Sequence, residues 1–219
     1  MIAKDLITDS VSALLTSDTA IHALSLMEEY RVSHLPIVNN EDFLGLVSEE
    51  DLYEFANPEA PIGAHPLSLN KPFVVSNQHI YEVIKLADEH KLSLIPVLDN
   101  KNIYLGVIRL VDLAHYFAKL SAVNQSGGII SLEMNIHDYS VAEIGQIVES
   151  NDAKILSLYY STITDSTKIE VTLKINRQDL AAIIQTFNRY NYTITASIFD
   201  NEGDELHDRY ASLMNYLNV

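Results

Sequence analysis

The hydrophobic and polar positions of residues 1–120 form one pattern that occurs twice, about 60 residues apart. Apolar residues recur at helical spacing in residues 19–30 and again in 79–90, which predicts two amphipathic helices. Each helix is followed by a short apolar run, a polar turn and a second apolar run, which predicts two strands joined by a tight turn. The acidic residues from Glu49 onward suit the start of another helix. Each copy is therefore predicted to be helix, strand, strand, helix.

The two copies also agree in residue type. Residues 35–38 return as 95–98, with a proline second in each run, and the glycine-led segment 45–51 returns as 106–112. Between the copies, residues 57–66 contain three prolines and a glycine, which predicts an irregular connection. Self-similarity over such a period indicates repeated structural units.

The pattern changes after residue 120. Small polar residues at 121–128 predict a linker. The apolar periods that follow predict the order βαββαβ, which is a ferredoxin-like split βαβ unit. The predicted elements are a strand at 129–134, a helix at 141–148, hairpin strands at 156–160 and 169–175, a helix at 180–190, a strand at 193–199 and an amphipathic C-terminal helix within 206–217.

The repeated motifs resemble the cystathionine-β-synthase (CBS) domain, a family that occurs in tandem as a Bateman module of βαββα units. The resemblance covers residues 1–120. It rests on residues 5–8, on the apolar-Pro-apolar strands at Pro36 and Pro96, and on the Gly-x-x-Ser-x-x-Asp turn. It implies a non-enzymatic regulatory protein that binds an adenosine-containing ligand, namely AMP, ADP, ATP or S-adenosylmethionine. It also implies a homodimer formed through helices, and places Pro36 and Pro96 among the ligand-binding positions.

The turn that contains Ser48 and Asp51 has chemistry suited to a nucleotide. A hydroxyl and free amides at a helix start can meet a phosphate, and a carboxylate one turn later can accept two hydrogen bonds from a ribose diol. The alternative is structural: Ser48 is an N-cap, and Asp51 with its acidic neighbours complements the helix dipole.

The second copy departs from the family pattern. Asp112 matches the ribose aspartate, but Arg109 replaces the usual Ser or Thr, and its guanidinium could clamp a phosphate instead. In family members a threonine in the segment before each copy often touches the ligand. The matching residues are Leu14 and Val74, which could flank an adenine.

Other cations near the repeated motifs are candidate phosphate partners. Arg31 and Lys91 end the two repeated helices, where the alternative reading is a charge that complements the helix C-terminus. His34 lies two residues before Pro36 and could lie beside a nucleobase, or it could be an exposed histidine at a strand end.

The element order after residue 128, placed behind a CBS pair, resembles an ACT domain, a small-molecule module that often binds amino acids between subunits. The junction at 137–140 has no glycine for close backbone approach, and Asp138 or Ser140 suits an N-cap. A domain that pairs with its copy by edge strands is therefore the favoured reading. We expect an α/β (α+β) protein with repeats at 1–60 and 61–120, a linker at 121–128 and an ACT-like domain at 129–219.

The amino-acid composition limits the classes of partner and the location that we expect for the protein. The formal charge of −16 argues against nucleic acid, and a highly charged ligand such as ATP would need local compensation, for example from Mg²⁺. Cysteine is absent, which excludes disulfides and thiol catalysis. No apolar stretch approaches the ~20 residues of a membrane span, and the N-terminus lacks signal-peptide features. A cytoplasmic protein is expected.

Catalytic motifs are lacking in the sequence. The eight histidines show no metal-ligand spacing, and no nucleophile elbow, phosphate-binding loop or dinucleotide fingerprint occurs. We therefore expect no catalytic residue, no metal site and no required cofactor. The alternative to a ligand sensor is a ligand-free scaffold that dimerises or binds an unknown protein partner.

Overall fold

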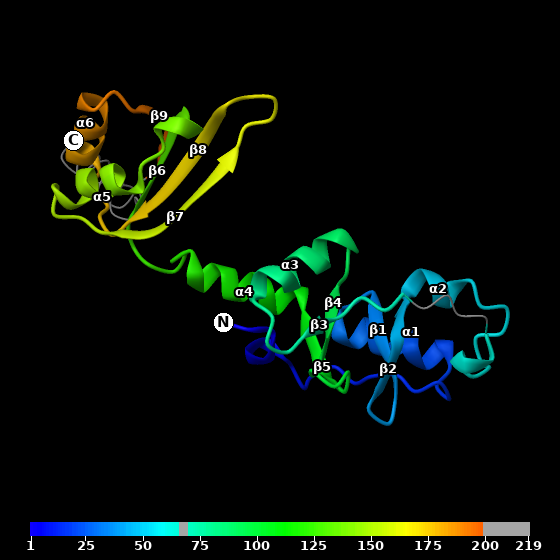
Figure 1. The fold of residues 1–219 in the computed structure, drawn as a ribbon. Helices are drawn as coiled ribbons and strands as arrows, with labels where there is room; N and C mark the ends of the chain where they lie inside the picture. Colours follow the sequence, from blue (N-terminus) through cyan, green and yellow to red (C-terminus); the bar gives the residue numbers. More distant parts are fainter. Residues whose placement is uncertain (66–69, 199–219) are drawn as a thin grey trace, which may run out of the picture. The chain divides into compact units, whose positions relative to one another are not determined.

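The computed structural model describes residues 1–65 and 70–198 (Figure 1). The chain folds into two compact units, Met1–Tyr116 and Phe117–Val219. The predicted C-terminal helix within 206–217 and the last residue of the strand predicted at 193–199 lie outside the described residues.

The first unit contains the predicted repeat. Its regular elements, in chain order, are the 3-10 turn η1 (Ala3–Leu6), α1 (Ala20–Tyr30), β1 (His34–Asn39), β2 (Asp42–Ser48), α2 (Glu49–Tyr53), η2 (Ile62–Ala64), β3 (Val74–Val75), α3 (Ile80–Glu89), β4 (Leu94–Leu98), β5 (Tyr104–Arg109) and α4 (Leu110–Leu120). The residues of α4 from Phe117 onward are counted with the second unit. The helices and hairpins predicted from the two copies are all present. The first helix after a hairpin, α2, has only five residues.

The two hairpins have the same internal geometry. In each, a glycine of the second strand opposes the residue after the proline: Gly45 faces Ile37, and Gly106 faces Val97, next to a register shift. Both glycines have positive φ, 151° and 143°. Glycine adopts this conformation at no steric cost, so the repeated Gly is explained by the bulged strand itself.

The segments that precede the two copies are exchanged between them. Near the N-terminus, the Thr8 amide donates to the Val107 carbonyl of β5 at 2.9 Å. In the segment before the second copy, the carbonyl of Asn70 accepts from the Leu46 amide of β2, also at 2.9 Å. Each hairpin is therefore extended by a segment that leads into the other copy.

One hydrophobic core runs through both copies of the first unit. It includes fully buried side chains from each, such as Leu35 and Ile37 from β1 and Ile95 and Val97 from β4. The second strand of each hairpin adds to it. A shared core explains why the repeats are found as one compact unit.

Up to residue 198, the second unit forms a four-stranded antiparallel sheet with two helices that follow α4. Its elements are β6 (Gly128–Asn135), η3 (Ile136–Asp138), α5 (Val141–Glu149), β7 (Ile155–Thr162), β8 (Lys168–Ile175), α6 (Ala181–Arg189) and β9 (Thr193–Ile198). The strand order is β7-β8-β6-β9. Figure 1 shows α5 and α6 on the same side of this sheet. The elements predicted between residues 129 and 198 are thus present in the predicted order.

The alternation of residues along β6 and β8 decides which face of that sheet is buried. Ile130 and Leu132 of β6 and Val171 and Leu173 of β8 are fully buried and pack with α5 and α6. Intervening residues such as Thr172 point to the other face and are partly exposed. In the part of the chain that the structure describes, no helix is both long and apolar enough to cross a bilayer.

Candidate ligand-binding clefts

Two clefts in the first unit contain the aspartates of the repeated turns. Cleft one has a volume of about 220 Å³ and is lined by His34, Leu46, Ser48, Glu50, Asp51, Asn70, Pro72, His90 and Leu92. Cleft two has a volume of about 610 Å³ and is lined by Tyr30, Arg31, Val32, Ser93, Arg109, Leu110, Val111, Asp112, Ala114 and His115. Each cleft combines residues of both copies.

The two clefts occupy corresponding places in the repeat. Ser48 and Asp51 of cleft one match Arg109 and Asp112 of cleft two. On the opposite wall, His90 and Leu92, which follow α3, match Tyr30 and Val32 at the end of α1. The pseudosymmetry of the fold thus generates two sites with different linings.

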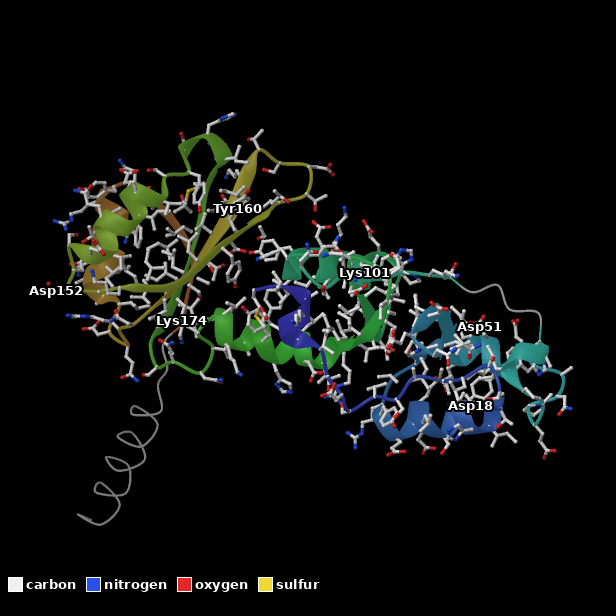
Figure 2. All side chains as sticks on the ribbon, turned by 60° about the horizontal axis from the view of Figure 1, so that its bottom comes forward. Asp18, Asp51, Lys101, Asp152, Tyr160 and Lys174 are labelled. Atoms are coloured by element: carbon white, nitrogen blue, oxygen red, sulfur yellow. The ribbon has the colours of Figure 1, made fainter. Side chains whose placement is uncertain are left out.

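Asp51, labelled in Figure 2, is partly occupied by its own turn. Its Oδ2 accepts from the Ser48 amide at 2.9 Å and from the Ser48 hydroxyl at 2.7 Å, and the Ser48 Oγ accepts from the Asp51 amide at 3.1 Å. This is a capping box: the structural alternative predicted the N-cap at Ser48, but not the hydrogen bonds that Ser48 donates to Asp51. Among the described residues, none donates to Asp51 Oδ1, so one carboxylate oxygen is left for a ligand.

Both carboxylate oxygens of Asp112 accept a hydrogen bond from Arg109. The Arg109 Nε donates to Oδ2 and an Nη donates to Oδ1, both at 2.9 Å, in a bidentate pair. The side chains are 28% and 27% exposed, so the pair is largely shielded from water. The hydrogen bonds to Asp112 raise the pKa of the Arg109 guanidinium. The residue that differs between the copies therefore changes the state of the repeated aspartate.

His34 lies at the junction of the copies and on the wall of cleft one. Its Nδ1 accepts from the Ser93 amide at 3.4 Å and lies 3.1 Å from the hydroxyls of both Ser33 and Ser93. Burial lowers the pKa of His34, while the charges of Asp51 and Glu50 oppose that shift. The imidazole is half-buried, not an exposed strand-end residue.

The remaining predicted residues divide into cleft and surface or core positions. Arg31 lines cleft two. Lys91 instead forms an exposed ion pair with Asp88, at 2.6 Å, and lines neither cleft. Leu14, Val74, Pro36 and Pro96 are buried in the first unit and line neither cleft.

Several residues of cleft one were not predicted. Asn70 and Pro72 precede the second copy, and His90 and Leu92 follow its first helix. Glu50 was noted only for its charge at a helix start. The repeat could have indicated that Asn70 and His90 line this cleft. The segment that leads into the second copy pairs with β2 of the first copy, and so places residues of the second copy beside the turn of the first.

Gly45 and Gly106 are not among the residues that line the two clefts. A Cβ at position 106 would lie 2.6 Å from the Ile7 Cγ2 atom. Gly106 therefore accommodates the N-terminal segment on β5, and not a ligand.

The second unit has a cleft of its own, of about 380 Å³. It is lined by Glu133, Met134, Asn135, Asp138, Glu143, Lys168, Tyr190, Asn191, Tyr192 and Thr193. Ser140 lies beside it and is the N-cap of α5, where it accepts from the Glu143 amide at 3.3 Å. Within the described ranges, no three His, Asp or Glu side chains gather closely enough to hold a metal ion in either unit.

Comparison with known proteins identifies the repeated unit. The CBS domain family matches residues 3–57 and 68–119. An inosine-5'-monophosphate dehydrogenase of Streptococcus pyogenes serotype M3 is 28% identical over 94 residues, which are 42% of this chain and 19% of that protein. The chain thus spans about a fifth of that relative.

Two further proteins match most of their own length to this chain. The CBS domain-containing protein YhcV of Bacillus subtilis is 25% identical over 51% of this chain and 81% of its own length. A crystal structure of a CBS domain pair/ACT domain protein from Thermotoga maritima is 23% identical, with a TM-score of 0.49, over 54% of this chain and 98% of its own. With the family match at two successive stretches and the repeated turn, residues 3–57 and 68–119 of this chain are a tandem pair of CBS domains.

Proposed function

We propose that this chain is a non-enzymatic regulatory protein whose CBS pair binds an adenosine-containing ligand in cleft one. The observation that carries the proposal is the free Oδ1 of Asp51 at the edge of a cleft built from both copies. A ribose diol offers two hydroxyl donors, and a carboxylate oxygen with free lone pairs accepts them.

The lining of cleft one supports a nucleoside. Leu46, Pro72 and Leu92 provide apolar walls for a flat base, while Asn70 offers an amide with both donors and acceptors. The volume of about 220 Å³ is below the ~300 Å³ at which pockets for drug-sized ligands begin. The cleft therefore suits a nucleoside moiety better than a polyphosphate.

Isothermal titration with adenosine, AMP, ADP, ATP and S-adenosylmethionine, with and without Mg²⁺, tests this proposal. The informative variant is Asp51→Asn. Its amide oxygen can still accept the two bonds from Ser48, but its nitrogen replaces the free carboxylate oxygen. We expect adenosine affinity to fall about tenfold or more, because a charge-assisted hydrogen bond to the ligand is lost.

Asp42→Asn is the matched control. Asp42 is an exposed aspartate at the start of β2, outside both clefts, and the same change there should leave binding unaltered. Binding of adenosine that is equal in Asp51→Asn and the wild type would place the ligand elsewhere. Failure of every adenosine-containing ligand to bind would overturn the function.

We further propose that the second unit is an ACT-like module through which copies of the chain pair and the ligand state is relayed. Its strand order β7-β8-β6-β9, with both helices on one face, supports a ferredoxin-like split βαβ arrangement. The edge strand β7 supports the pairing: its eight residues include no charge and no proline, and Tyr159 and Tyr160 are 56% and 50% exposed. Such an edge is a template for another strand.

Sedimentation of the full chain tests pairing at β7. Ser161→Lys introduces a charge into an exposed position of this edge and should shift a dimer toward the monomer. Ser197→Lys makes the same change at an exposed position of the other edge strand, β9, and should have no effect. Dissociation by Ser197→Lys alone would move the interface to β9, and a monomeric wild type would exclude pairing.

A relay between the ligand and the dimer requires a difference in affinity. The ligand favours one arrangement of the pair only by the free energy with which it binds that arrangement better than the other. The same titrations on the Ser161→Lys chain measure this coupling, because linked binding and pairing must affect each other equally.

A ligand-free scaffold is the second candidate function. It is favoured by the capping box at Asp51 and the ion pair at Asp112, since both aspartates already have partners in their own turns. Absence of binding in the titrations, together with recovery of a stable protein partner, would support it.

A further inference from the structure

The sheet of the second unit has one face that α5 and α6 do not cover. Side chains alternate between the two faces along each strand. On β6, Ile130 and Leu132 pack with the helices, so Ile129, Ser131 and Glu133 point to the opposite face, which is called the open face here. The strand register places residues of the other strands beside them on this face: Tyr159, Lys168, Glu170, Thr172, Lys174, Ala196 and Ile198.

One part of the open face is apolar and exposed. Ile198 pairs with Ile129, and Ala196 pairs with Ser131, at the end of the sheet where β9 finishes. Ile198 is 59% exposed, and Tyr159 on the opposite edge strand is 56% exposed. A sheet face that is left to water normally carries polar side chains, so this apolar part indicates a surface that another element covers.

The other part of the open face is charged, which limits the size of the covering element. Glu170 pairs with Glu133, and Glu133 forms an ion pair with Lys168. Two copies that packed their whole open faces together would bury these charges, which is costly. A single helix is narrow enough to cover the apolar part and leave the charged part in water.

The chain continues from this apolar part with an amphipathic sequence. Ile198 is followed by residues 199–219, which lie outside the described residues. Leu206, Tyr210, Leu213 and Leu217 are spaced four, three and four residues apart, which predicts one apolar stripe along a helix. The seven residues 199–205 can span up to ~23 Å, whereas four strands are only about 14 Å across. The stripe can therefore reach the apolar part of the sheet from which it starts.

We propose that residues 206–217 form a helix whose apolar stripe packs on the apolar part of the open face of its own chain. The short connection favours the chain's own sheet over that of another copy, because it holds the stripe near this face at a high effective concentration. The second unit then has helices on both faces, and only its edge strands are left for pairing. This inference does not depend on ligand binding in the first unit.

Single introduced cysteines test the proposal, because the chain has no cysteine of its own. Ala196 and Ser197 are adjacent exposed residues of β9 that point to opposite faces, since they pair with Ser131 and Ile130. In the full chain we expect a maleimide to alkylate Ala196→Cys at least about tenfold more slowly than Ser197→Cys. Each rate is divided by the rate of the same variant in urea.

A second substitution identifies what protects the cysteine. Leu213→Asp places a charge in the apolar stripe and should bring the alkylation rate of Ala196→Cys to that of Ser197→Cys. Asn215→Asp adds the same charge on the predicted opposite side of the helix and should leave the protection intact. General unfolding would speed both cysteines, so the ratio of the two rates is the quantity to compare.

Three results would overturn the proposal. Equal rates for Ala196→Cys and Ser197→Cys in the otherwise unchanged chain would mean that nothing covers the open face. Protection that survives Leu213→Asp would assign the cover to a different element. Protection that disappears on dilution would mean that the helix comes from a second copy of the chain.

Discussion

His34 illustrates how one side chain joins the two CBS domains. Its Nδ1 lies 3.1 Å from the hydroxyl of Ser93 in the second copy and 3.1 Å from the hydroxyl of its neighbour Ser33. Burial between the copies disfavours the charged imidazole and lowers the pKa of His34.

A pH-dependent stability follows from His34. Its pKa is lowered from the ordinary value of 6.5, so around pH 6 the unfolded chain binds this proton more readily than the folded chain. The folded chain has its full stability when the pH is above the pKa that His34 has in the unfolded chain. This stability is lost as the pH falls through the lower pKa that His34 has in the folded chain. Urea unfolding at pH 7.5 and 5.5 should therefore show a larger loss of stability in the wild type than in His34→Asn.

Asparagine keeps an acceptor near the position of Nδ1 but does not titrate, so the comparison isolates the ionisation. Equal losses of stability in the wild type and His34→Asn would mean that His34 is as easily protonated in the folded chain as in the unfolded chain.

Tyr104 carries a buried hydroxyl with no hydrogen-bond partner among the residues described, and burial raises its pKa. An unpaired buried hydroxyl costs about 1–3 kcal/mol. Tyr104→Phe keeps the stacked contact with Phe43 and should raise the free energy of unfolding by about 1 kcal/mol.

Tyr192→Phe, in contrast, should lower the free energy of unfolding by about 1 kcal/mol, because the Tyr192 hydroxyl donates to Glu143 at 2.8 Å.

Chemical denaturation of the two variants checks these opposite signs. A Tyr104→Phe protein that is less stable than the wild type would indicate that the hydroxyl has a partner in solution, such as a bound water.

At the scale of elements, the repeated helices α1 and α3 end alike. Arg31 and Lys91 follow them with φ of 55° and 52°, in the left-handed region where glycine is usual. Any other residue in this region costs about 1–2 kcal/mol. The two cations thus occupy strained positions of equal geometry, yet only Arg31 lines a cleft.

The strain predicts opposite effects for one substitution at two sites. Lys91→Gly should raise the free energy of unfolding by up to about 1 kcal/mol, because the relief of strain exceeds the added entropy of the unfolded chain. Its exposed ion pair with Asp88 contributes little. Lys85→Gly, on the exposed side of α3, should lower it by about 1 kcal/mol. Thermal and urea unfolding measure both, and equal destabilisation would exclude the left-handed geometry.

At the scale of the whole molecule, the exchange of leading segments makes the CBS domains interdependent. Residues 3–8 contact the second copy through three backbone hydrogen bonds of 2.9 Å: Ala3 to Gln78, Lys4 to Ser76 and Thr8 to Val107. Ala3 is fully buried. The N-terminal segment therefore completes the distant domain and not the one that follows it in the chain.

Deletion of residues 1–8 tests this dependence. We expect a loss of about 2–4 kcal/mol from the lost hydrogen bonds. Hydrogen exchange should increase in β5, where the segment pairs, with much less change in β2, whose own edge is covered by the segment at Asn70. A larger increase of hydrogen exchange in β2 than in β5 would contradict the pairing of the N-terminal segment with the second CBS domain.

Local chemistry was sufficient to predict the elements. The helices at 19–30 and 79–90, the hairpins and the elements after residue 128 follow from side-chain period and turn residues, which act over a few positions. The N-cap at Ser48 was the structural alternative for its turn, and Ser140 was one of two N-cap candidates beside Asp138, because a cap involves residues only three apart. The repetition itself predicted two equivalent candidate sites, one at each repeated turn.

The sequence by itself thus determined the repeat, its CBS membership, the order of helices and strands, and the two aspartates of the repeated turns. Only the tertiary structure decided that Asn70 and His90 line the same cleft as Asp51, that Lys91 lies outside the clefts while Arg31 lines one, and that Gly106 accommodates Ile7. The physical reason is distance along the chain: a cleft is made by residues that only the packing of the core brings together.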